Sequence, residues 1–80
     1  MNERDIDKHV GKRLRLFRLV RDISQKKLGQ VVGVTFQQIQ KYESGQNRIG
    51  AGKLYLFSEF MNVPVQLFYQ GLNEPRGCDR

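Results

Sequence analysis

The stretch from Ile23 to Gly45, ISQKKLGQVVGVTFQQIQKYESG, constrains the fold of this chain more than any other segment. Ser24 and Thr35 are residue types whose side chains cap the first turn of a helix. Between them lies Gly33, and glycine readily adopts the left-handed conformation that ends one helix and redirects the chain. The stretch therefore predicts two short helices joined by a tight turn, which is a helix-turn-helix arrangement.

The second helix of this motif has an apolar side and a polar side. At about 100° per residue, Ile39 and Tyr42 fall on one side, and the opposite side carries Gln37 and Lys41. If the apolar pair is buried, the polar pair points away from the domain. A glutamine can bind adenine with two hydrogen bonds, and a lysine can reach guanine acceptors or a phosphate. Gln37 and Lys41 are therefore the predicted base contacts of a recognition helix in a DNA major groove.

Phe36 lies at the flank of the same helix, directly after the capping residue Thr35. Two interpretations stay open. Its ring could pack on a thymine methyl group, which would be a base contact. It could instead fold back on a neighbouring side chain. Thr35 and Gln38 are expected to reach phosphates or to cap the helix rather than to read bases.

Three segments together carry a resemblance to a known family: GKRLRLFR (11–18), SQKKLGQVVGVTFQQIQKYESGQNRI (24–49) and LFSEFMNVPVQLF (56–68). Over residues 9 to 70 the chain resembles the DNA-binding domain of the Cro/C1-type (XRE-like) helix-turn-helix repressors of bacteria and phages. The resemblance implies an all-α fold, a compact five-helix lambda-repressor-like DNA-binding domain with a central helix-turn-helix. No single segment would be specific enough for this inference.

The resemblance also implies roles for individual residues. Arg18 and Glu43 occupy positions at which an arginine and a glutamate pair and tie the first helix to the recognition helix. Gln25 matches a glutamine that touches a DNA phosphate and braces the outer glutamine of the recognition helix, here Gln37. Its place at a helix N-terminus supports the first of these roles, since free backbone N–H groups and the helix dipole favour an anion there.

A polar loop follows the recognition helix and contains Asn47 and Arg48. Such a loop would run along the sugar–phosphate backbone, where contacts position a protein without specifying sequence. Arg48 is the stronger predicted phosphate contact of the two, and a solvated turn is the alternative.

The chain divides into a flexible N-terminal arm (1–7), a helix-turn-helix domain (8–72) and a C-terminal tail (73–80). The first helix is expected from about Asp7 to Arg21, because Val10, Leu14 and Phe17 recur at the spacing of a buried face. A fourth helix is expected from Gly50 or Ala51 to Met61. A fifth should begin at Val63-Pro64, since proline is tolerated in a first helical turn.

Two aromatic or aliphatic residues of the expected fourth helix, Leu56 and Phe60, lie off its inner face. They could contact the following helix, or they could contribute to a self-association surface. We expect a two-fold dimer interface that includes apolar residues of the last segment. Its tentative members are Leu56, Phe60, Phe68, Tyr69 and Leu72.

The composition of the chain limits the classes of partner that it is expected to bind. The formal net charge of +6 favours a polyanion, although charge alone does not distinguish DNA from RNA or acidic lipid. There is no apolar run long enough for a transmembrane helix and no secretory signal, so no membrane partner is expected. The single cysteine, Cys78, cannot form an internal disulfide, and a cytoplasmic, bacterial or phage-encoded setting is expected.

An enzyme is not expected. Catalysis requires a nucleophile with a base or a metal cluster, and the chain has one histidine, His9, and one cysteine in the tail. No spacing of zinc ligands is present, so neither a metal nor a cofactor is predicted.

The sequence thus predicts a sequence-specific double-stranded DNA-binding transcriptional regulator, expected to be a repressor. It would bind a palindromic operator as a homodimer, with the recognition helix 35–43 in the major groove. The alternative is a protein-interaction module that keeps the helix-turn-helix fold, such as an antitoxin or a coactivator.

Overall fold

The structure, a computed structural model, describes residues 1–72 of the chain. In this part of the chain the elements are α1 (Glu3–Val20), α2 (Gln25–Val32), α3 (Phe36–Ser44), α4 (Ala51–Met61) and a short 3₁₀ helix, η1 (Val65–Phe68). The predicted all-α class is therefore confirmed for the described residues. The predicted tail, residues 73–80 with Cys78, lies outside them.

Helix α1 begins earlier than the sequence analysis predicted. The Asn2 side chain accepts a hydrogen bond from the Asp5 backbone N–H at 2.9 Å, and the Asp5 carboxylate accepts one from the Asn2 backbone at 3.5 Å. This reciprocal capping box starts the helix at Glu3. The expected start at Asp7 was wrong, and Glu3–Asp7 belong to the helix rather than to a flexible arm.

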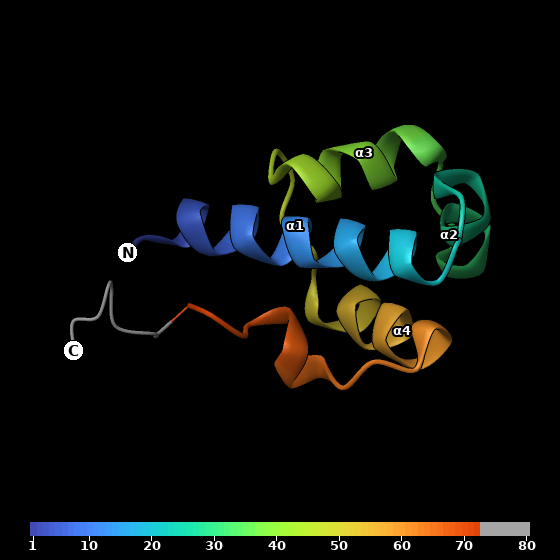
Figure 1. Ribbon diagram of the computed structural model, residues 1–80. Helices are drawn as coiled ribbons and strands as arrows, with labels where there is room; N and C mark the ends of the chain where they lie inside the picture. The colour runs from blue at the N-terminus through green and yellow to red at the C-terminus, as the bar shows by residue number, and fades with distance from the viewer. Residues whose placement is uncertain (73–80) are drawn as a thin grey trace.

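Helix α1 is the central element of the domain. In Figure 1 it passes between α3 on one side and α4 on the other, while α2 lies at its C-terminal end. The predicted stripe packs inward, with Leu14 fully buried, Val10 nearly so and Phe17 at the edge of the core. The core is completed by apolar side chains from every other element: Leu28, Val32, Ile39, Tyr42, Leu54, Phe57, Met61, Val63 and Phe68.

The predicted helix-turn-helix boundaries are confirmed. The Ser24 hydroxyl accepts from the Lys27 backbone N–H at 3.0 Å, and the Thr35 hydroxyl accepts from that of Gln38 at 3.2 Å. Helix α2 ends at Gly33, whose φ of 79° places it in the left-handed region. Both caps and the turn use signals that are local in the sequence, and these fix where α3 starts.

Two glycines allow the helices around α3 to approach closely. A Cβ on Gly29 would lie 2.5 Å from the Val34 carbonyl oxygen, so the α2–α3 turn packs directly against α2 at this point. A Cβ on Gly11 would overlap the carbonyl oxygens of Tyr42 and Glu43. Backbone atoms cannot move aside as a flexible side chain would. Both positions therefore require glycine for packing.

The predicted fifth helix is shorter than expected. Pro64 has extended backbone angles (φ −57°, ψ 140°), and only the four residues of η1 follow as a 3₁₀ turn. Phe68 of η1 is fully buried and contacts Phe17 edge-on, with ring centroids 5.1 Å apart. Phe68 is the fully buried residue of this segment, and Val65 and Leu67 pack partly buried against the core.

Polar side chains of α1 hold the C-terminal segment in place. Arg13 Nε donates to the Leu67 carbonyl at 3.0 Å, and His9 Nε2 donates to that of Gln70 at 2.6 Å. Just after the helix, Arg21 donates to the carbonyls of Met61 and Asn62 at the end of α4. These polar side chains therefore attach the C-terminal half of the chain to α1.

Candidate nucleic-acid interface

The outer side of α3 carries polar side chains over an apolar inner side. Ile39 is fully buried and Tyr42 is 7% exposed, whereas Gln37 and Lys41 are both exposed. Phe36, at the start of the helix, is 44% exposed, so its ring is not covered by the rest of the domain. The described residues thus leave an amide, an ammonium group and an aromatic ring on one accessible helix surface.

A buried ion pair fixes α3 against α1. Arg18 Nε donates to Glu43 at 2.6 Å and a second guanidinium nitrogen donates to the other carboxylate oxygen at 3.2 Å. The two side chains are 9% and 5% exposed. Arg18 also donates to the Ile23 carbonyl at 2.9 Å, which connects the pair to the turn before α2. This is the pair that the family resemblance implied.

Gln25 does not brace Gln37 as the resemblance implied. Its Nε2 donates to Glu43 at 3.0 Å, and its Oε1 accepts from Gln40 Nε2 at 3.2 Å. Gln40 and Glu43 are three residues apart on α3, so they share the edge that faces Gln25. Gln37 lies further round the helix. The i, i+3 spacing of Gln40 and Glu43 is the signal in the sequence that indicates this shared edge.

The remaining predicted phosphate contacts lie around the ends of α3. Thr35 and Asn47 are exposed and Gln38 is half-buried. The Thr35 hydroxyl accepts within its own helix cap, which leaves its O–H available as a donor. The Asn47 backbone N–H donates to the Lys41 carbonyl at 3.2 Å, so the loop is held close to the end of the recognition helix.

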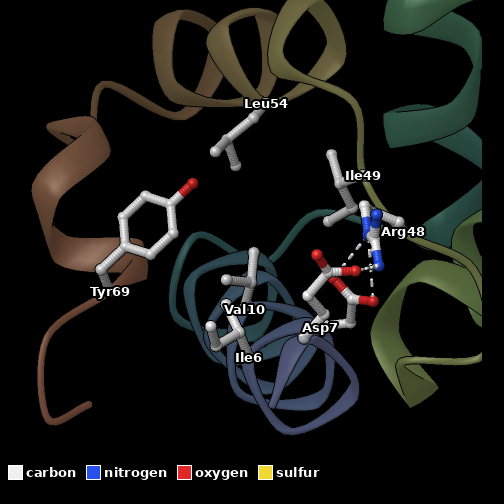
Figure 2. A pocket seen from close by; sticks show the side chains of 8 residues that line it. Ile6, Asp7, Val10, Arg48, Ile49, Leu54 and Tyr69 are labelled. Carbon is white, nitrogen blue, oxygen red and sulfur yellow. Dashed lines mark hydrogen bonds and ion pairs between the residues drawn. The ribbon is translucent and has the colours of Figure 1, made fainter. Parts of the chain in front are cut away.

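Arg48 is held by two carboxylates of α1. Its Nε lies 3.2 Å from both oxygens of Asp7, and another guanidinium nitrogen lies 2.7 Å from Glu3 (Figure 2). The hydrogen bonds to Asp7 and then Glu3 raise the pKa of Arg48. We call Glu3, Asp7 and Arg48 the acidic clamp, since two carboxylates face one guanidinium. The clamp was not predicted, because residues 1–7, which include both acidic residues, were expected to form a flexible arm.

An apolar groove of about 240 Å³ lies beside the acidic clamp. Figure 2 shows Ile6, Val10, Ile49, Leu54 and Tyr69 around it, contributed by α1, the loop before α4, α4 itself and the end of η1. Its polar edge is the acidic clamp, in which two carboxylates face one guanidinium. The groove therefore differs in character from the outer side of α3.

The tentative dimer residues separate into exposed and buried ones. Leu56, Phe60 and Tyr69 are 44%, 39% and 42% exposed, and Leu72 is half-buried. In the described residues, Leu56 and Phe60 thus keep accessible surface, although more than half of each residue is covered. Phe68 is fully buried, so its assignment to an interface was wrong. The sequence alone does not indicate that the Phe68 ring of η1 is buried in the core.

Within residues 1–72 no three metal-ligating side chains gather into a possible metal site. The same part of the chain contains no helix with the length and apolar character that crossing a membrane requires.

Several curated proteins align with most of this chain. An uncharacterized HTH-type transcriptional regulator of Sinorhizobium medicae is 55% identical over 65 residues, which are 81% of this chain and 47% of that protein. One from Sinorhizobium fredii is 46% identical over 76 residues, 94% of this chain and 53% of the relative. The chain thus spans about half the length of these relatives. An uncharacterized transcriptional regulator in the ATPase CF(0) region of Rhodospirillum rubrum is 44% identical over 73 residues, which are 89% of this chain and 68% of that protein.

A solved structure has a similar arrangement of helices. The restriction-modification controller protein C.AhdI from Aeromonas hydrophila superposes with a TM-score of 0.77 over 85% of this chain and 99% of its own. At 18% identity this likeness concerns the fold. The sequence model of the helix-turn-helix family matches residues 14–68, from α1 to the end of η1. The chain therefore belongs to the Cro/C1-type (XRE-like) helix-turn-helix family, in which its curated relatives are named transcriptional regulators.

Proposed function

We propose that this protein is a transcriptional regulator that binds double-stranded DNA sequence-specifically, with α3 in the major groove. The observation that carries the proposal is the exposure of Gln37 and Lys41 above a buried Ile39 and Tyr42. Amide and ammonium groups on one accessible helix surface match the donors and acceptors of base edges. A DNA partner also implies the bacterial cytoplasm as the place of action.

Phosphate contacts would supply most of the affinity. The net charge of +6 favours association with a polyanion. Gln25 and Thr35 lie at the N-terminal ends of α2 and α3, where backbone N–H groups favour anions. Gln38 and Asn47 complete the set on either side of the recognition helix. Binding should weaken steeply with salt, because each phosphate contact releases counterions.

Arg48 would act differently from the other phosphate contacts. Glu3 and Asp7 already hold the Nε and one terminal nitrogen of its guanidinium, so a phosphate would bind the remaining N–H groups. Such a contact brings the DNA phosphate close to two carboxylates. Arg48 would therefore contribute less than an unpaired arginine, and its contact would carry no base preference.

We further propose a two-fold homodimer and a palindromic operator. A dimer through Leu56, Phe60 and Tyr69 would use the apolar surface that the fold leaves exposed. Two recognition helices about 34 Å apart would then enter successive major grooves on one side of the duplex. Repression is proposed from the resemblance to Cro/C1-type repressors.

Selection of duplexes from a random pool at two salt concentrations tests this function. The wild-type protein should enrich a palindromic site, and Gln37→Ala should relax the preference at one position of each half-site by roughly 1–3 kcal/mol. Arg48→Ala should weaken all sequences alike. An unchanged preferred sequence with Gln37→Ala would show that α3 docks through another side. Retention of one stoichiometric protein partner, without salt-sensitive duplex binding, would favour the interaction-module alternative.

A further inference from the structure

The groove of about 240 Å³ beside the acidic clamp combines apolar walls with a charged edge. Figure 2 shows Tyr69 on one side of the groove and Arg48 with Asp7 on the other. Val10 and Leu54 also line it, and each is a core residue that is 6% exposed. The groove thus gives access from the surface to apolar side chains of the core.

The charged edge of the groove carries more negative than positive charge. Among the described residues that line it, Arg48 is the only cation, and it pairs with both Glu3 and Asp7. The Asp7 side chain is only 18% exposed, so one of these carboxylates lies largely out of solvent. The chain as a whole has the opposite excess, with a formal net charge of +6. The edge of the groove is therefore a local negative site on a basic protein.

We propose that this groove binds a small apolar molecule that carries one protonated amine. Binding sites for small molecules are concave and mainly apolar, with a few polar groups that fix the orientation of the ligand. Pockets for drug-sized ligands measure about 300–1,000 Å³, so a groove of about 240 Å³ fits a smaller molecule. The site lies apart from the outer side of α3, and its test needs no DNA.

The charges at the edge distinguish an amine from other ligands. A protonated amine would balance the excess negative charge while its apolar part covers Val10 and Leu54. An anion would approach two carboxylates, and the guanidinium between them already donates to both. A metal ion such as Ca²⁺ requires about six to eight oxygen ligands. Within residues 1–72 no three metal-ligating side chains come together, so a metal ion is disfavoured.

The test is a titration of the isotope-labelled full chain with phenethylamine, followed by the magnetic resonance shifts of the backbone amides. Phenethyl alcohol, which has nearly the same size and shape but no charge, is titrated in parallel at pH 7. The variant Asp7→Asn keeps the shape of the side chain and removes one negative charge from the edge. The matched control is Glu59→Gln, because Glu59 is exposed on α4 and does not line the groove.

We expect phenethylamine to shift the amides of residues that line the groove, with Ile6, Val10, Ile49 and Leu54 among them. In the wild type and in Glu59→Gln the amine should bind roughly 2- to 5-fold tighter than the alcohol, which is the size of effect that a partly exposed ion pair gives. Asp7→Asn should bind the two compounds equally well. The same spectra show whether each variant is folded.

Four results would overturn the proposed site. The first is the absence of saturable shifts at the groove with millimolar phenethylamine. The second is equal affinity of the wild type for the amine and the alcohol, and the third is an unchanged preference for the amine in Asp7→Asn. The fourth is a shift of the same amides when the protein alone is diluted, because a second copy of the chain would then be the occupant of the groove.

Discussion

Three side-chain hydrogen bonds converge on the buried carboxylate of Glu43. Its carboxylate accepts two hydrogen bonds from Arg18 and one from Gln25, at a position where 5% of the side chain remains exposed. In the described residues no buried side-chain nitrogen or oxygen lacks a partner. A buried charge is tolerated when its hydrogen bonds are complete, and removing one partner leaves it uncompensated.

Arg18→Met should therefore destabilise the fold strongly. The variant leaves Glu43 buried without its cation, and such losses cost about 3–5 kcal/mol. Urea unfolding followed by circular dichroism measures the change. Arg15→Met, exposed on the same helix, is the matched control and should have little effect. Equal stability of the two variants would show that the pair contributes nothing to folding.

Asp7→Asn should strengthen DNA binding for all sequences. It weakens the acidic clamp and removes one carboxylate from beside the phosphate that Arg48 would contact, while Glu3 still pairs with the guanidinium. Each fully neutralised phosphate steepens the slope of log K against log salt by about 0.9, so the slope should steepen by up to this amount. Titration of a fixed duplex at several salt concentrations measures this slope. The control Glu59→Gln removes one negative charge from an exposed position on α4. If it steepens the slope by the same amount, the effect of Asp7→Asn comes from net charge alone.

At the scale of elements, helix starts and turns followed from local sequence, whereas contacts between distant residues did not. Ser24, Gly33 and Thr35 act on backbone groups within four residues, so their pattern was sufficient. Asn2 and Asp5 form a similar local cap, and its N-x-x-D pattern was available but was not used. The acidic clamp joins residues 41 and 45 positions apart, and no periodicity indicates such a pair.

The site was partly predictable for the same reason. Helical periodicity placed Gln37 and Lys41 on the outer side of α3. It could not identify the partner of Gln25, which depends on how α2 crosses α3, and the family resemblance suggested the wrong residue. Nor could an apolar pattern divide the last segment into Phe68, which is buried, and Tyr69, which is exposed.

Gly29→Ala should destabilise the helix-turn-helix although alanine is the better helix former. The added Cβ would lie 2.5 Å from the Val34 carbonyl oxygen, which is backbone. We expect a loss of about 1–3 kcal/mol from overpacking. Gly52→Ala in α4 meets nothing within 4 Å and should instead gain up to about 1 kcal/mol. Thermal unfolding measures both changes, and a stabilised Gly29→Ala would contradict the packing argument.

At the scale of the whole molecule, α1 separates two surfaces of different character. Helix α3 and the ends of α2 carry the candidate interface on one side, and α4 lies on the other (Figure 1). Two groups of exposed apolar side chains are candidates for self-association: Leu56, Phe60 and Tyr69 in the C-terminal half, and Leu16, Leu19 and Val20 on α1. Either set could associate, so the assignment of the dimer surface needs a comparison between them.

Leu56→Glu combined with Phe60→Glu should convert the dimer to a monomer. Placing carboxylates in a self-complementary apolar interface buries like charges against each other, which costs several kcal/mol. Sedimentation equilibrium measures the mass. Leu19→Glu, on the other apolar surface, is the control and should leave the dimer intact. Dissociation by the control instead would move the interface to α1.

The buried carboxylate of Glu43 contributes both to the fold and to the orientation of side chains at the recognition helix, and this has an evolutionary consequence. Arg18 keeps Glu43 in the interior, and Glu43 orients the amides that end at Gln40. Because these amides lie beside the recognition helix, a lineage that replaces Glu43 changes the surface of α3 and the stability of the fold together. New target sites should therefore arise through changes at Gln37, Lys41 or Phe36, which take no part in these hydrogen bonds, while Glu43 stays constant.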